Sequence, residues 1–285
     1  MRSTLRWIAL IIAAVVFLVP FFVLVRDGVA TGWSTVEEVF TDSDLSFARS
    51  LLNSTIVAVL QTVGQIVLCS LAGYGLARIP YRHAPVVLYA IVATLMVPTA
   101  VTFVPSFVVV SSLGWLSDFR GLVVPGLFSA LNVFLFRQYF LDFPVALEEA
   151  GRLDGLSAWG TYWRIVIPNS TGFLAAIAVI DFIGSWNQFL WPLLIAQDSS
   201  TWTVQVALSN LLTAQNPQPT LLFAAAAVSL LPIVLLFIIA QRYLVRGVTD
   251  MDNSAPLTGP GGPHPIPGGG PGASLPAGGR GEGVV

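Results

Sequence analysis

Lysine is absent from this chain of 285 residues, in which all 13 basic residues are arginines. A Walker A loop needs a lysine to hold nucleotide phosphates, and Schiff-base catalysis needs a lysine amine as its nucleophile. The absence of lysine therefore excludes both kinds of chemistry. We expect a chain that is not an enzyme.

Cysteine is nearly absent as well. Cys69 is the single cysteine, which excludes an intrachain disulfide and a cysteine-rich metal site. Its position within an apolar run indicates a small packing residue. The sequence also contains neither an HExxH nor a GxSxG motif, so a membrane enzyme is the least favoured class. We expect no metal site and no cofactor bound by this chain.

Charged residues make up only 10% of the sequence, whereas apolar residues make up 55%. Several uncharged runs reach the roughly 20 residues that cross a bilayer, which indicates an all-α, multi-pass integral membrane protein. Pro98 and Pro105 predict a bent or locally broken third span. Six transmembrane helices are predicted, at residues 7–25, 51–77, 84 to about 113, 121 to about 139, about 171 to 195, and 221–241.

The arginines predict the orientation of these spans, because short loops rich in arginine stay in the cytoplasm. With a cytoplasmic N-terminus, the external loops keep only three arginines, Arg26, Arg49 and Arg120. The cytoplasmic side then collects nine: Arg2, Arg6, Arg78, Arg82, Arg137, Arg152, Arg164, Arg242 and Arg246. We therefore expect a protein of the cell membrane with both termini in the cytoplasm.

The composition divides the chain into three parts. Residues 1–44 are predicted to be an N-terminal transmembrane helix and an external segment, and residues 45–253 a transmembrane core. Residues 255–285 are rich in Gly and Pro and carry few apolar side chains, so they cannot bury enough surface to offset the entropy of ordering. We predict a disordered cytoplasmic tail there.

The most informative segment is a polar loop at residues 142–168, between the fourth and fifth spans. Its predicted first helix begins at Pro144, and Gly155 after Asp154 favours a left-handed turn at its end. A second helix is expected to start near Ser157 and to end at Pro168. Glu148 and Arg152 are four residues apart, and we expect them to pair on the helix surface. Ala150 and Gly151 are expected to let another protein approach the backbone.

The spacing of this loop is similar to the EAA loop of ABC importer permeases. The pattern reads Glu149-Ala150-Gly151, then Gly155 after three residues, then Ile165-Val166-Ile167-Pro168 after nine more. Gly151 and Ile167 replace the second Ala and the Leu of that pattern. Further segments resemble carbohydrate-importer permeases, with the closest similarity to the MalG-like half of the heterodimeric type; they include Asn53-Ser54, Met96-Val97-Pro98, Phe136-Arg137-Gln138-Tyr139-Phe140 and Trp186-Asn187-Gln188-Phe189-Leu190-Trp191-Pro192.

This resemblance implies a type I ABC importer permease fold and a role in a larger assembly. The implied partners are a second permease subunit, two ATP-binding cassette subunits that use ATP and Mg, an extracytoplasmic solute-binding protein, a carbohydrate substrate and the lipid bilayer. No nucleic acid is expected. The loop would couple the permease to an ATPase through these residues: Glu148, Glu149, Ala150, Gly151, Arg152, Asp154, Gly155, Ile165 and Pro168.

Polar residues within the spans are candidates for the substrate pathway, because burying them in lipid is costly. Asp181 is predicted to lie deep in the fifth span, and three roles stay open for it: a sugar hydroxyl acceptor, a hydrogen bond between helices, or a proton relay. Asn132, Asn187 and Gln188 are weaker candidates, since amides also join helices in membranes. Trp186 is expected either to stack on a sugar ring or to lie in an interfacial aromatic belt.

One alternative belongs to another class of transporter. In a self-sufficient secondary carrier, Asp181 would be the ion-coupling carboxylate. Such a carrier would work in liposomes without an ATPase, whereas the loop at residues 142–168 favours an importer subunit.

Overall fold

The long uncharged runs form helices, because a helix satisfies the backbone polar groups of its own segment in lipid. The computed structural model describes residues 2–29, 33–41, 46–213 and 219–253, and all regular structure in these ranges is helical. In chain order the elements are α1 (Arg2–Val29), α2 (Trp33–Thr41), α3 (Phe47–Arg78), α4 (Ala84–Thr94), α5 (Thr99–Ser112), α6 (Phe119–Val123), η1 (Val124–Gly126), α7 (Ala130–Asp142), α8 (Val145–Leu153), α9 (Ala158–Thr161), η2 (Tyr162–Val166), α10 (Ile167–Asn169), α11 (Thr171–Trp186), α12 (Leu190–Ile195), η3 (Ser199–Thr201), α13 (Val204–Thr213) and α14 (Pro219–Asn253).

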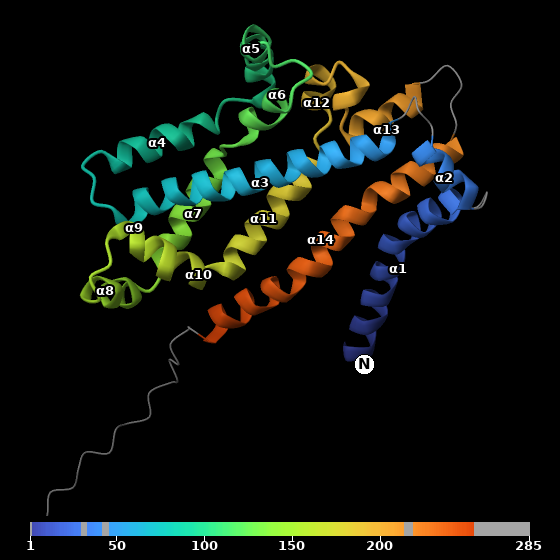
Figure 1. Ribbon diagram of the computed structural model, residues 1–285. Helices are drawn as coiled ribbons and strands as arrows, with labels where there is room; N and C mark the ends of the chain where they lie inside the picture. Colours follow the sequence, from blue (N-terminus) through green and yellow to red (C-terminus); the bar gives the residue numbers. More distant parts are fainter. Residues whose placement is uncertain (1, 30–32, 42–45, 214–218, 254–285) are drawn as a thin grey trace, which may run out of the picture.

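The long helix α3 lies at the centre of the bundle, packed along α7 and α11, and α14 packs against α11 and α1 (Figure 1). Helix α3 contributes side chains to three hydrophobic clusters. Phe47 and Ala58 belong to the first, Val57 to the second, and Cys69 and Tyr74 to the third. Because one helix contributes to every cluster, its position fixes the others relative to one another.

Two helices are individually long and apolar enough to cross a bilayer, namely Phe47–Arg78 and the segment Pro219–Arg242 of α14. They confirm the predicted second and sixth spans, and both helices extend beyond the predicted ends. Among the described residues, three pairs of consecutive helices pass the same test together, which gives at most five spans. The apolar stretch Arg6–Val19 of α1 is shorter. The expected number of six spans therefore stays a prediction.

The predicted third span is broken more sharply than a kink. Helices α4 and α5 meet at 95°, and Pro98 is the residue that precedes α5. A proline disfavours the α conformation in the residue before it, so the break falls at Val97 as the sequence predicted. Pro105 lies inside α5 without ending it.

The fourth and fifth spans were predicted to be continuous, and both are interrupted. Helix α7 follows α6 and η1 after a bend of 43°, and α11 ends at Trp186 before α12 begins at Leu190. In a continuous helix the ring of Pro125 would meet the carbonyl of Gly121, and Pro192 would meet that of Gln188. The chain avoids both clashes by breaking its helices there.

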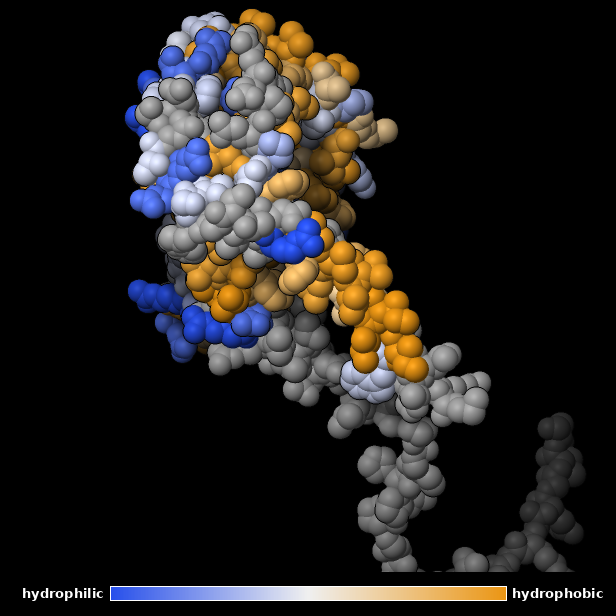
Figure 2. Space-filling model, turned by 90° about the vertical axis from the view of Figure 1, so that its right-hand side faces the viewer, coloured by the Kyte–Doolittle hydropathy of each residue, from blue (hydrophilic) through white to orange (hydrophobic). Residues whose placement is uncertain are grey.

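A large apolar surface is left uncovered by this chain. The side chains of α1 are exposed along most of the helix, with Trp7 67% and Phe17 75% exposed, and they form an orange strip in Figure 2. Lipid tails or apolar side chains of another subunit can cover such a surface. The segment 255–285, predicted to be a tail, lies outside the described residues.

Candidate functional site

Residues 142–168 form a helical hairpin at one end of the bundle, with α8 as its first arm and α9, η2 and α10 as its second (Figure 1). Pro144 precedes α8, which begins at Val145. Gly155 adopts a φ of +80°, the left-handed conformation that its sequence position predicted. The Ser157 hydroxyl accepts a hydrogen bond from the Gly160 amide and caps α9. The local sequence therefore specifies both arms and the turn between them.

Gly151 is not on the outer face of the hairpin, contrary to the expectation that it would receive another protein. It is buried, and a Cβ built on it would lie 2.4 Å from Cδ1 of Ile165 in the second arm. An added methyl group here would require the end of the Ile165 side chain to shift. Ala150, by contrast, is exposed.

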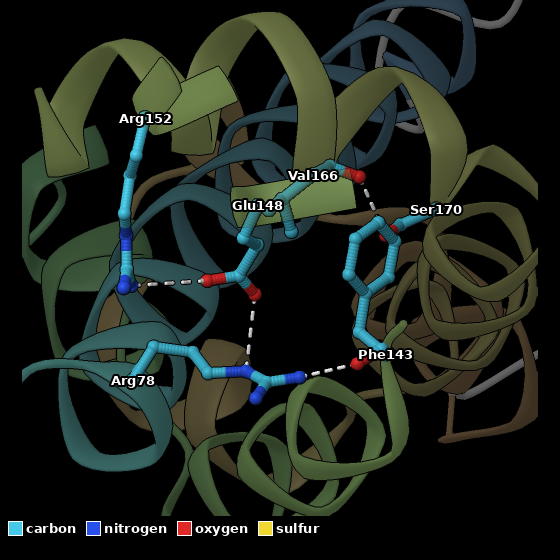
Figure 3. Close-up of polar contacts among 6 residues, drawn as sticks. All are labelled: Arg78, Phe143, Glu148, Arg152, Val166 and Ser170. Atoms are coloured by element: carbon cyan, nitrogen blue, oxygen red, sulfur yellow. Dashed lines mark hydrogen bonds and ion pairs between the residues drawn. The ribbon is translucent and has the colours of Figure 1, made fainter. Parts of the chain in front are cut away.

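Glu148 also differs from expectation, because it is buried at 2% exposure rather than lying on the helix surface. Its carboxylate pairs with Arg78 Nε at 3.0 Å and with Arg152 at 3.8 Å (Figure 3). The predicted pairing with Arg152 is confirmed, but Arg152 is largely exposed and the closer partner comes from the end of α3. The side of α8 that faces α3 is set by tertiary packing, which a helical spacing rule cannot indicate.

The outer face of the hairpin consists of exposed residues on α8 and the turn. Leu153 is 89% exposed. The remaining exposed members are Glu149, Ala150, Arg152, Asp154 and Gly155. This face combines acidic side chains with an apolar one that nothing in the described chain covers. Such a combination is typical of a surface that binds another protein.

The second arm contains a π-helical turn, η2, which leads into α10. Pro168 was predicted to end this arm, but it lies within α10, and the helical path continues to Asn169 before α11 turns away by 78°. Side chains bind the backbone here, since Asn169 Nδ2 donates to the Ile165 carbonyl at 2.7 Å. The Ser170 hydroxyl donates to the Val166 carbonyl, also at 2.7 Å (Figure 3). The arm is thereby joined directly to α11.

A row of polar side chains on α3 binds the broken fourth span. These residues are spaced four apart and donate to carbonyl groups around the helix break. They are Gln61 to Leu122 at 2.9 Å, Gln65 to Gly126 at 2.8 Å and Cys69 to Ser129 at 3.5 Å. Trp191 Nε1 donates to the carbonyl of Gly121, which Pro125 cannot bond, at 3.0 Å. Neighbouring helices therefore supply the hydrogen bonds that the broken helix lacks.

Asp181 is joined to the same polar row. Asn132 Nδ2 donates to both carboxylate oxygens of Asp181 at 2.9 Å and to Gln65 Oε1 at 2.8 Å. Asn132 is buried, whereas Asp181 and Gln65 are half-buried. The structure brings Asp181 and Asn132 together from α11 and α7, with Gln65 on α3.

The other predicted pathway residues lie apart from this group. Trp186 is only 2% exposed and stacks on Phe182 inside the chain's own core, so its ring faces neither a sugar nor an interfacial belt. Asn187 is exposed at the end of α11 and accepts a hydrogen bond from Gln205 at 3.5 Å. Gln188 is half-buried beside it.

Arg78 is the functional candidate that the sequence did not single out. In the sequence analysis Arg78 served only as one of the cytoplasmic arginines. The sequence around it does not mark it out, because an arginine at the end of a membrane helix is common and its partner Glu148 lies 70 positions away.

A family comparison decides what kind of protein carries this hairpin. Residues 1–250 match the model of the binding-protein-dependent transport system inner membrane component. The chain belongs to this permease family. The match covers the whole described bundle, including the hairpin.

Individual relatives support the same family assignment. This permease is 35% identical over 228 residues to the sn-glycerol-3-phosphate transport system permease protein UgpE of Yersinia pestis bv. Antiqua (strain Antiqua), covering 77% of this chain and 80% of that protein. It is 31% identical over 214 residues to the arabinooligosaccharides transport system permease protein AraQ of Halalkalibacterium halodurans, covering 74% and 75% of the two chains.

A solved structure shares the fold. The crystal structure of a bacterial ABC transporter involved in the import of the acidic polysaccharide alginate superposes with a TM-score of 0.76 at 22% identity, covering 85% of this chain and 95% of that one. The permease therefore has the type I ABC importer fold, as the sequence indicated. It is a non-enzymatic transport subunit of the membrane, and the ion-coupled carrier is not favoured.

Proposed function

We propose that this permease forms half of the translocation pathway of an ATP-driven importer and is coupled to an ATPase through the loop at residues 142–168. The observation that carries the proposal is the hairpin itself. Its inner side is packed and ion-paired, while its outer face leaves Leu153 and Glu149 exposed. A rigid element with an uncovered binding face is suited to transmit movement from a partner.

The membrane topology that fits this role has six spans, in which α4 with α5 and α6 with α7 each form one. The others are α1, α3, α11 and α14, and residues 158–169, the first half of the third bent pair, belong to the hairpin. The termini and the hairpin are then cytoplasmic, which agrees with the nine arginines on that side. In Figure 1 the hairpin, the start of α1 and the end of α14 lie toward the same side of the molecule.

The partners that complete the importer are a second permease, two ATPase subunits and a solute-binding protein. The exposed apolar side chains of α1 and of α4, with Tyr89 72% exposed, support contacts with lipid and with a second permease. ATP and Mg are bound by the ATPases. Their closure would move the hairpins and shift the permeases between inward-open and outward-open states, provided the hairpin is held more tightly in one of them.

The cargo that the relatives support is a sugar or sugar derivative. UgpE is named for sn-glycerol 3-phosphate and AraQ for arabinooligosaccharides. Both names indicate small polyhydroxylated solutes, which are recognised by hydrogen bonds.

We propose that Asp181, held by Asn132, belongs to the substrate pathway. Gly184 lies three residues further along α11, and a Cβ added there meets nothing within 4 Å, so the helix surface is open at that position. Asp181→Asn should keep the contact with Asn132 and retain uptake within about threefold, whereas Asp181→Leu should lower uptake about tenfold by removing one of the two acceptors of the buried Asn132 amide. Substrate uptake by the assembled transporter measures both. Equal activity of the two variants would remove Asp181 from the pathway.

Reconstitution tests the proposed function as a whole. The permease is purified from its native membrane with the subunits that accompany it and is incorporated into liposomes. Uptake of a labelled sugar should require internal ATP and the external binding protein, and an ion gradient should have no effect. ATP-independent uptake by the isolated chain would contradict the proposal.

A further inference from the structure

The end of α3 is attached to the hairpin by a buried ion pair. Arg78 Nε lies 3.0 Å from Glu148 Oε1, with side chains that are 13% and 2% exposed (Figure 3). Arg78 also donates to the carbonyl of Phe143, the residue that follows α7. One guanidinium therefore joins α3, the end of α7 and the first arm of the hairpin.

The second arm is attached to the same face of α3. The Ser70 hydroxyl shares a hydrogen bond of 2.7 Å with the Tyr162 hydroxyl, and the rings of Tyr74 and Tyr162 are 5.1 Å apart. Ser70, Tyr74 and Arg78 are spaced four residues apart, so they lie in one row along the helix. Both arms thus contact a single row on α3.

A buried ion pair is not explained by stability alone. Withdrawing two charges from water costs about as much as their attraction returns, so an apolar pair of similar volume is often equally stable. What Arg78 supplies is a fixed point of attachment, because its guanidinium meets the Glu148 carboxylate through Nε and the Phe143 carbonyl through Nη2 at the same time. Such an attachment is useful where a movement has to be passed on.

We propose that Arg78 and Glu148 are positioning residues that make α3 a second transmission helix. The first is α11, to which the hairpin is joined covalently. A displacement of the hairpin then moves the cytoplasmic end of α3 together with α11. Since α3 contributes to all three hydrophobic clusters, this movement reaches the whole bundle. The inference rests on the proposed coupling role of the hairpin.

The experiment compares uptake per ATP hydrolysed in the complete, reconstituted transporter. The double variant Arg78→Met with Glu148→Gln removes both charges and leaves no unpaired buried charge, so it should fold. We expect ATP hydrolysis to stay within about twofold while uptake per ATP falls about tenfold, a typical allosteric coupling. The charge exchange Arg78→Glu with Glu148→Arg restores the attraction and should recover at least part of the loss.

Arg82→Gln is the matched control, because it removes an exposed positive charge four residues beyond Arg78, in the loop that follows α3. It should behave as wild type. Unchanged uptake per ATP in the double variant would overturn the proposed role of the ion pair. This holds also if uptake and hydrolysis fall equally, which would indicate a merely structural role. Failure of the ATPase to co-purify with the wild-type permease would instead contradict the proposed function.

Discussion

Reversing the charge of Glu149 should stop transport. Glu149 is exposed beside the buried Glu148, so Glu149→Lys leaves the packing of the hairpin unchanged. On the proposed docking face, a like-charge contact with a basic partner costs several kcal/mol, which corresponds to a fall in uptake on the order of 100-fold. The measurements are substrate uptake and the ATPase activity stimulated by the binding protein, both in the reconstituted transporter.

The matched control makes the same charge change elsewhere. Glu37 is exposed on α2, away from the hairpin, and Glu37→Lys should leave uptake within about twofold of wild type, as exposed substitutions usually do. If Glu149→Lys transported and hydrolysed normally in a transporter that contains its ATPase, the hairpin would not be the coupling element.

Replacing Gly73 with valine should prevent the bundle from assembling. A Cβ at Gly73 would lie 2.6 Å from Phe136 Cβ and 2.8 Å from the backbone nitrogen of Arg137. Because a backbone atom cannot move aside like a side-chain end, α3 and α7 would have to separate. We expect a loss of about 3 kcal/mol or more in the free energy of unfolding. Thermal unfolding of the purified permease in detergent measures the effect.

Gly75 is a control within the same helix. A Cβ there meets nothing within 4 Å, so Gly75→Ala should be neutral or slightly stabilising through its higher helix propensity. Equal stability of the Gly73 and Gly75 variants would contradict the close contact between α3 and α7.

Local features of the hairpin could be predicted from the sequence. A glycine after an aspartate predicted the left-handed turn at Gly155, and a serine before an apolar segment predicted the cap at Ser157, because both depend on a few neighbouring residues. The positions of the helix breaks were only partly predictable. Pro98 was identified as a break, whereas no break was predicted at Pro125 or Pro192.

The family resemblance was carried by spacing, and the comparisons confirm it. The directions of the side chains could not be predicted from spacing. Glu148 and Gly151 were assigned to the outer face, although Glu148 is buried against Arg78 of α3 and Gly151 is buried beside Ile165 of the second arm. Helical periodicity gives the angle between two residues on one helix, but it does not give the side from which the next helix approaches.

The sequence by itself determined that this is an all-helical membrane protein with a short polar hairpin and no nucleotide site of the Walker type, since composition, missing residue types and turn chemistry act locally. Only the tertiary structure decided that Asn132 holds Asp181 and that Arg78 holds Glu148. Both contacts join residues far apart in the chain. Which residues meet is decided by how the helices pack. This packing depends on all the hydrophobic clusters to which α3 contributes.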